Sequence, residues 1–211
     1  QGSQFVGMGK AFSENFTQAR DVFEEVNDSL SQSLTKIMWD GDIEDLTKTE
    51  NAQPAIMSVS IAIFRVLESE IGIDFGKIGY CAGHSLGEYS ALVALKALDL
   101  ETAAKLLKTR GISMQKSVPI GQGAMAALIG SSIEQAERLA KKISDQKIDL
   151  VCDVANDNAP GQVVLSGHAD AIEAAINLSV DYGAKKAMKL PVSAPFHCSL
   201  MRPAADIMKE A

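Results

Sequence analysis

The sequence has few of the residues on which several large classes of protein depend. Its 211 residues include three cysteines, at positions 81, 152 and 198. Their spacing fits no zinc pattern, and an odd number does not suggest a disulfide framework. Aromatic residues make up 5% of the chain, which argues against stacking platforms for single-stranded nucleic acid. We therefore expect reduced thiols, no metal site and a cytoplasmic protein.

Positive charge and long hydrophobic runs are also scarce. Twenty Lys and Arg stand against 27 Asp and Glu, a net charge of −7, so the basic footprint of a nucleic-acid-binding protein is missing. The longest apolar stretch, 54–67, contains Ser58, Ser60 and Arg65 and is too short to span a bilayer. It predicts a buried helix opened by Pro54. No secretory signal precedes it. Because the basic footprint is missing as well, we expect neither a nucleic-acid nor a membrane partner.

The first 119 residues read as a mixture of helices and one strand. Apolar residues at alternating steps of four and three predict an amphipathic helix over 12–30. The short apolar segment 78–82, flanked by glycine, predicts a buried strand. Helical patterns follow at 85–98 and 100–116. A strand that leads directly into a helix indicates an α/β core.

A regular order of elements follows Pro119. Strand-like and helix-like patterns alternate as β-α-β-β-α-β, the ferredoxin-like order. Their predicted ranges are 124–129, 132–144, 149–154, 162–166, 169–182 and 184–190. We therefore predict a core formed by 1–119 and 191–211, with a small subdomain inserted at 120–190.

The strongest chemical signal is Gly83-His-Ser-Leu-Gly87, a G-x-S-x-G motif between a predicted strand and a predicted helix. In a nucleophile elbow the turn is so sharp that the serine backbone is strained and both flanking sites must lack bulk. The following helix points its N-terminus at the reaction centre, which favours an oxyanion there. We interpret Ser85 as a nucleophile and the backbone N–H of Leu86 as an oxyanion donor.

A serine nucleophile needs a base, and the chain has three histidines. His84 lies inside the elbow, too close in sequence to turn back onto Ser85. His168 opens a predicted helix, where a capping role is expected. His197 remains as the candidate base, with a loop position between Phe196 and Cys198 as its alternative interpretation.

Other polar residues allow both a functional and a structural interpretation. Arg110 lies beside a packed helix face, where it can clamp a substrate carboxylate or pair with Glu88 or Glu101. Asn156 belongs to a turn signal with amides available to a substrate. The basic cluster at Lys185, Lys186 and Lys189 is either a solvated face or a surface that steers an acidic protein.

Together these segments resemble the malonyl-CoA:acyl carrier protein transacylases of bacterial fatty acid synthesis. The resemblance covers essentially the whole chain, with the matching stretches in the same order and spacing. They are Gln1-Gly-Ser-Gln4, Gln53-Pro-Ala55, Gly83-His-Ser-Leu-Gly-Glu-Tyr-Ser-Ala-Leu92, Arg110-Gly111, Gly123-Ala-Met-Ala-Ala127, Pro160-Gly-Gln-Val-Val164 and Pro191-Val-Ser-Ala-Pro-Phe-His-Cys-Ser-Leu-Met201.

The resemblance implies an α/β fold, in which a hydrolase-like core with a parallel sheet carries an inserted ferredoxin-like subdomain. It also implies a ping-pong transfer of malonyl from malonyl-CoA to the phosphopantetheine thiol of acyl carrier protein, with no bound cofactor. The enzyme is expected to be a monomer.

The resemblance assigns roles to individual positions of this sequence. Ser85 is the nucleophile, His197 the base, and Gln1 with Leu86 the oxyanion hole. The implied substrate-binding residues are Arg110 for the malonyl carboxylate, His84 as its helper, and Asn156. The pair Lys185 and Lys186 is a hypothetical dock for the acidic carrier.

The sequence also departs from the family pattern. A strand before Gln1 is missing, as is a C-terminal stretch that supplies further core strands and a glutamine that orients the catalytic histidine. We expect the sequence to be incomplete at both ends.

Three alternative functions stay open. One is the acyltransferase domain of a polyketide synthase. Another is a serine hydrolase or thioesterase, for which Asp145, Asp149, Asp153 and Asp170 supply possible acids between Ser85 and His197. The third is a non-catalytic binding module, which a serine paired with a histidine makes less expected.

Overall fold

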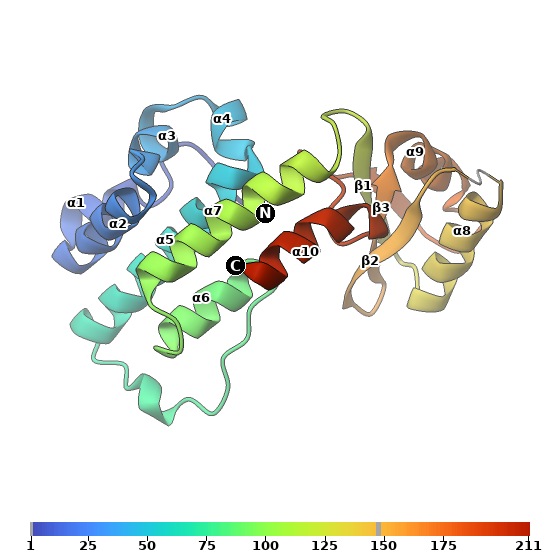
Figure 1. Ribbon diagram of the computed structural model, residues 1–211. Coiled ribbons are helices and arrows are strands. Elements are labelled where there is room, and N and C mark those ends of the chain that lie inside the picture. Colours follow the sequence, from blue (N-terminus) through green and yellow to red (C-terminus); the bar gives the residue numbers. More distant parts are fainter. Residues whose placement is uncertain (1, 147–148) are drawn as a thin grey trace. The chain divides into compact units, whose positions relative to one another are not determined.

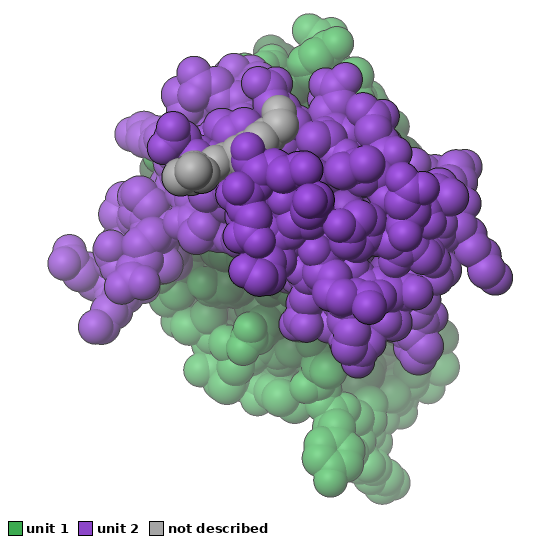
Figure 2. Space-filling view, turned by 90° about the vertical axis from the view of Figure 1, so that its right-hand side faces the viewer, with its two compact units in different colours: residues 1, 3–112 green, residues 2, 113–211 purple. Residues whose placement is uncertain are grey.

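The computed structural model describes residues 2–146 and 149–211, which fall into two compact units. Residues 3–112 belong to unit 1, and residues 113–211 together with Gly2 belong to unit 2 (Figure 2). This division differs from the predicted boundaries at 119/120 and 190/191, because residues 113–119 and 191–211 group with the second unit. The predicted domain assignment stays a prediction.

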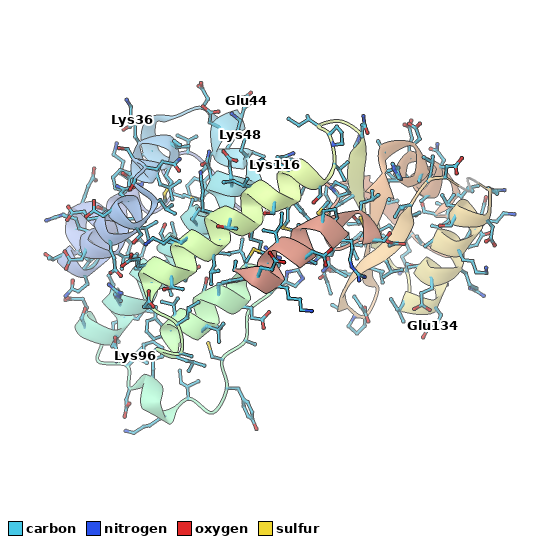
Figure 3. All side chains as sticks on the ribbon, in the orientation of Figure 1. Lys36, Glu44, Lys48, Lys96, Lys116 and Glu134 are labelled. Carbon is cyan, nitrogen blue, oxygen red and sulfur yellow. The ribbon has the colours of Figure 1, made fainter. Side chains whose placement is uncertain are left out.

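The regular secondary structure of unit 1 consists of helices among its described residues. Its elements are α1 (Lys10–Asn15), α2 (Thr17–Leu30), α3 (Leu34–Asp40), α4 (Ile43–Thr47), α5 (Thr49–Glu70), the 3₁₀ helix η1 (Phe75–Lys77), α6 (Gly87–Ala94) and the first part of α7 (Leu100–Ser117). Charged side chains such as Lys36 on α3 and Glu44 on α4 extend away from the ribbon (Figure 3). Buried apolar side chains form the core of the unit, chiefly between α2 and α5.

The packing of α2 against α5 follows from the apolar spacing in the sequence. Val22, Phe23 and Val26 on α2 are buried against Met57 and Ile61 on α5. Burying side chains of this size contributes about 1.5–3 kcal/mol each. The periodicity that predicted one helix over 12–30 therefore identified the buried face correctly.

That predicted helix is divided at Phe16, whose backbone is extended at φ −130° and ψ 123°. The Phe16 N–H closes α1 by donating to Phe12 O, and its carbonyl accepts from Arg20 N to begin α2. Phe12 and Phe16 still pack against the same core on both sides of the break. The helix break could not be predicted, because the apolar pattern continues across it.

Helix α5 begins earlier than predicted, at Thr49, and Pro54 lies inside it. Proline lacks an N–H, so the Glu50 carbonyl loses its usual donor four residues on. Gly111 of α7 packs against this first turn so closely that a Cβ there would lie 2.4 Å from Glu50 Cα. A glycine at this position lets α7 approach α5 and brings its neighbour Arg110 beside Gln53.

The strand predicted over 78–82 is not formed. The segment has no regular secondary structure, Ile78 is 48% exposed and Tyr80 is 96% exposed. A strand is stable only when its N–H and C=O groups pair with a neighbour. None of the described strands lies in unit 1, so the apolar run has nothing to pair with there.

Unit 2 holds a four-stranded sheet with helices. Its elements are β1 (Gly123–Ile129), α8 (Ile133–Gln146), β2 (Cys152–Ala159), β3 (Gln162–His168), α9 (Ala169–Leu178), β4 (Lys186–Lys189), the 3₁₀ helix η2 (Ser199–Met201) and α10 (Arg202–Glu210). The strand order is β2-β3-β1-β4, and β1–β3, β1–β4 and β2–β3 are all antiparallel. The chain is therefore an α/β protein, as predicted.

The two faces of this sheet are covered by different segments. Ala124, Ala126 and Leu128 of β1 are buried with apolar residues of α8 and α9, which pack together beside the sheet (Figure 1). Met125 faces the other way and packs with Phe196, from the segment that follows β4. Alternation along β1 thus buries both faces. This is the one sheet among the described residues, and none of its strand pairs is parallel.

Within 2–146 and 149–211, no helix is both long enough and apolar enough to cross a membrane.

Candidate active site

Ser85 lies in a strained turn at the start of α6. Its φ is +53°, in the left-handed region that non-glycine residues seldom occupy. Such a residue costs roughly 1–3 kcal/mol and persists only where its surroundings impose it. The turn is closed by Gly87 N donating to His84 O at 2.9 Å and Glu88 N donating to Ser85 O at 3.1 Å. This is the local geometry expected of a nucleophile elbow.

The two glycines of the motif differ in what surrounds them. A Cβ at Gly83 would lie 1.9 Å from the carbonyl carbon and oxygen of Gly87, whereas a Cβ at Gly87 would meet no described atom within 4 Å. The turn is tight enough to exclude any side chain at Gly83. The expectation that both flanking sites must lack bulk therefore holds in this structure only for the first glycine.

We predict that Gly83→Ala opens the turn, lowers the free energy of unfolding by about 1–3 kcal/mol and displaces Ser85. Gly87→Ala is the matched control, and because alanine suits the first turn of a helix better than glycine, it should be neutral or slightly stabilising. Thermal unfolding of the two variants checks this. Equal destabilisation by both would contradict the difference in crowding.

The N-terminus of α6 lies next to Ser85. Leu86 is buried, and its backbone N–H donates to no acceptor among residues 2–146 and 149–211. The aligned peptide dipoles of a helix give its N-terminus a partial positive charge. An N–H in this position can stabilise a developing oxyanion, as the sequence predicted for Leu86. The second predicted donor, Gln1, lies outside the described residues.

Arg110 is brought to Ser85 by α7. Its Nη2 donates to Ser85 Oγ at 3.1 Å, and its Nη1 donates to Gln53 Oε1 at 2.5 Å. The ion pair considered with Glu88 or Glu101 is not formed. Glu101 pairs instead with Lys105 one turn further along α7, and no salt bridge between described residues involves Arg110.

Gln53 has a role at this site that its sequence position did not reveal. It is fully buried on α5, and its Nε2 donates to Thr49 Oγ1 at 2.8 Å while its Oε1 accepts from Arg110. A buried amide with both ends bonded has one preferred orientation. Gln53 therefore fixes the plane of the guanidinium and directs Nη2 toward Ser85. The sequence offered one sign of this role, because Gln53 belongs to Gln53-Pro-Ala55, one of the stretches that carry the family resemblance.

Burial changes the electrostatics of Arg110. The guanidinium is half-buried, and this desolvation lowers the pKa of Arg110 below its usual value, while the nearby Tyr89 and Glu88 oppose the shift. Arginine nevertheless remains protonated at neutral pH. A cation held in partly desolvated surroundings attracts a carboxylate more strongly than one exposed to water.

His84 lies beside the elbow and is exposed. It lines a hollow of about 420 Å³ in unit 1 together with Ser60, Phe64 and Cys81. The predicted assistance of His84 to Arg110 stays a prediction.

His197 belongs to unit 2. It is exposed, has a left-handed φ of +58°, and lines a hollow of about 560 Å³ with Asp153, Cys198 and Arg202. Burial raises the pKa of the Cys198 thiol, so this neighbour is a poor nucleophile. The base role of His197 stays a prediction.

His168 is already engaged elsewhere in unit 2. It stands before the first residue of α9, but its side chain does not cap that helix. Its Nδ1 instead accepts from Val151 N at 2.8 Å. The expected capping role is therefore wrong, because the ring bonds to the neighbouring strand segment.

The remaining predicted residues also lie in unit 2. Asn156 is part of β2, half-buried and paired with Val164 of β3. It thus occupies a strand, whereas the sequence indicated a turn. Lys185 and Lys186 are exposed; Lys186 begins β4, an edge strand of the sheet, and Lys185 directly precedes it. Within the described parts of the chain, no group of three or more His, Cys, Asp or Glu side chains is arranged to hold a metal ion.

The chain belongs to the acyl transferase domain family, whose model matches residues 1–211. The strained Ser85 beside a helix N-terminus and the half-buried Arg110 agree with this family.

Relatives within this family carry a more specific name. The chain is 46% identical over 211 residues to the malonyl CoA-acyl carrier protein transacylase of Bacillus subtilis strain 168, covering 100% of the chain and 64% of that protein. It is 42% identical over 206 residues to the Escherichia coli K12 protein of the same name, covering 98% of the chain and 65% of that protein. The chain thus spans just under two thirds of the length of these relatives.

Solved structures give the same result. The acyl-carrier-protein S-malonyltransferase of Bartonella henselae matches with a TM-score of 0.92 and 49% identity, over 100% of this chain and 66% of that one. A malonyl-transacylase solved in complex with its type II PKS acyl-carrier protein matches with a TM-score of 0.86 and 39% identity, over 99% of this chain and 65% of that one.

Proposed function

We propose that the protein is an [acyl-carrier-protein] S-malonyltransferase of fatty acid biosynthesis. In the first half-reaction, Ser85 Oγ attacks the thioester carbonyl of malonyl-CoA and His197 takes its proton. The N–H groups of Leu86 and Gln1 stabilise the tetrahedral oxyanion. Its collapse breaks the C–S bond, and the CoA sulfur leaves with the proton from His197. The product is a malonyl ester of Ser85.

The second half-reaction reverses these roles. The phosphopantetheine thiol of acyl carrier protein gives its proton to His197, and the thiolate attacks the ester carbonyl. The C–O bond to Ser85 breaks, and the serine oxygen recovers the proton. Arg110, helped by His84, holds the free malonyl carboxylate throughout, and Asn156 lines the substrate site. The reaction needs no metal or bound cofactor.

The observation that carries this proposal is the hydrogen bond from Arg110 Nη2 to Ser85 Oγ. A nucleophile in contact with a half-buried guanidinium suits an acyl group that ends in a carboxylate, because two parallel N–H···O bonds can hold it. The names of the relatives support the same substrate. A serine hydrolase has no need for a fixed cation at this distance from its nucleophile.

The reaction is tested with radiolabelled malonyl-CoA and holo acyl carrier protein. The full-length enzyme should carry the label on one serine when the carrier is absent and pass it to the carrier when it is added. Label released as free malonate would indicate a hydrolase. A protein that takes no label would indicate a binding module.

We also propose the finer fold. The order β1-α8-β2-β3-α9-β4 and the strand order β2-β3-β1-β4 support a ferredoxin-like subdomain at 120–190. The elbow before α6 supports a hydrolase-like core formed by 1–119 and 191–211. We further expect a cytoplasmic monomer.

We propose that Lys185 and Lys186 form part of the dock for the acidic carrier. Both are exposed; Lys186 is the first residue of the edge strand β4, where lysines also discourage unwanted strand pairing, and Lys185 directly precedes it. Reversing both charges (Lys185→Glu with Lys186→Glu) should lower kcat/KM for the carrier about tenfold, because charges at an interface rim act mainly on association. Malonyl loading should stay unchanged.

The matched control reverses two exposed lysines of α8 in the same unit, Lys141→Glu with Lys142→Glu. It changes the net charge equally and should have a much smaller effect on the carrier reaction. Steady-state rates at low salt measure both pairs. Equal losses in loading and transfer, or equal effects of the two pairs, would contradict the dock.

A further inference from the structure

The segment that carries His197 is anchored on both sides of the histidine. On one side Phe196 is 4% exposed, and its N–H donates to Ala194 O at 3.1 Å. On the other side Ser199 N donates to Asp153 Oδ2 at 2.7 Å. His197 lies between these anchors with a left-handed φ, a conformation that its surroundings must impose.

Asp153 is a rigid support for this second anchor. It lies on β2, where it pairs with Ser166 of β3, and its carboxylate reaches a residue 46 positions later in the chain. Hydrogen bonds to an ionised acceptor are shorter and about twice as strong as neutral ones. The sheet thus restrains the backbone two residues after His197.

Two other hydrogen bonds of this segment act locally. Cys198 Sγ donates to Pro195 O at 3.1 Å and Met201 N donates to Cys198 O at 2.9 Å, which fixes the shape of the turn. Neither bond joins the segment to a strand. The bond from Ser199 N to Asp153 ties the backbone after His197 to β2, beside an apolar cluster that joins Met201 to Val164 of β3.

We infer that Asp153 is a positioning residue, which holds the His197 imidazole in place for proton transfer through its bond to the Ser199 N–H. This inference rests on the proposed base role of His197. It goes beyond it by assigning a function to a carboxylate that touches no reacting atom. Proton transfer depends steeply on geometry, and a misplacement of about 1 Å can cost about a hundredfold in rate.

The test compares Asp153→Ala and Asp153→Asn in the full-length protein, with single-turnover malonyl loading of Ser85 as the readout. Asp153→Ala should lower the loading rate about tenfold to a hundredfold and leave KM for malonyl-CoA unchanged. Asp153→Asn keeps an oxygen that can accept from Ser199 N and should recover most of the rate. Asp157→Ala, which removes an exposed carboxylate from the same strand, is the control and should load normally.

A double-mutant comparison separates positioning from a general loss of structure. In a His197→Ala background, Asp153→Ala should lower the residual loading rate no further, because the group it positions is gone. An equal loss in both backgrounds, or an asparagine variant as slow as the alanine variant, would overturn the inference.

Hydrogen exchange gives a readout that does not depend on activity. The Ser199 amide should exchange faster in Asp153→Ala than in the parent protein or in Asp153→Asn. If the parent protein takes no malonyl label at all, the proposed function fails. If it loads normally and Asp153→Ala loads equally fast, only the positioning role fails.

Discussion

Replacing Ser85 with alanine is expected to abolish malonyl loading. The hydroxyl is the atom that forms the ester, so no other group of the elbow can substitute for it. Loss of a nucleophile that acts with a base lowers kcat by roughly 10⁴-fold or more. Intact-mass measurement after incubation with malonyl-CoA should detect one malonyl group on the parent protein and none on Ser85→Ala.

Ser90→Ala is the matched control for this variant. Ser90 lies on α6, and its Oγ is buried without a hydrogen-bond partner among the described residues. Removing a hydroxyl that makes no bond costs little stability. The control should therefore load malonyl at the parental rate. A Ser85→Ala protein that still carries malonyl on a side chain would show that another residue is the nucleophile.

The elbow could be predicted because its sequence signature reflects local sterics. A G-x-S-x-G pattern predicts a backbone crowded around one serine. The positive φ of Ser85 and the lack of room for a Cβ at Gly83 confirm this crowding. The pattern did not show that Gly87 has room for a side chain. Crowding depends on which atoms the turn brings together, and the spacing of glycines in the sequence does not indicate these atoms.

Strand β1 and helices α8 and α9 were also recognisable, because each has a regular apolar pattern. Alternation in β1 and the 3.6-residue period of α8 are properties of neighbouring residues. The segment 78–82 shows the limit of that reasoning. Its composition suits a strand, but a strand also needs a partner, and partners are set by the whole chain.

Gln53 and Asp153 could not be predicted because each acts through a contact distant in sequence. Gln53 reaches Arg110 across 57 positions, and Asp153 reaches Ser199 across 46. Both contacts require that elements far apart in the chain pack side by side. In the case of Gln53, the contact depends on the close approach that Gly111 allows between α7 and α5.

Arg110→Ala is expected to remove the preference for malonyl over uncharged acyl groups. Truncating one partner of a buried charge pair costs about 2–5 kcal/mol, which corresponds to roughly a 30- to 5,000-fold slower loading of malonyl. Loading of acetyl-CoA should rise at the same time, because a neutral methyl group no longer has to displace a half-buried guanidinium from its polar contacts. The measurement is competitive loading of Ser85 from a mixture of malonyl-CoA and acetyl-CoA.

The ratio of the two products also separates selectivity from stability. Arg110→Ala removes the bond that the buried Gln53 Oε1 accepts from Arg110, so some loss of folded protein is expected, at about 1–3 kcal/mol. A change in the folded fraction lowers both products equally and leaves their ratio unchanged. Arg110→Lys keeps the charge but lacks the planar fork that reaches Gln53 and Ser85 together, so it should restore malonyl loading only in part. A malonyl-to-acetyl ratio unchanged in Arg110→Ala would show that another group recognises the carboxylate.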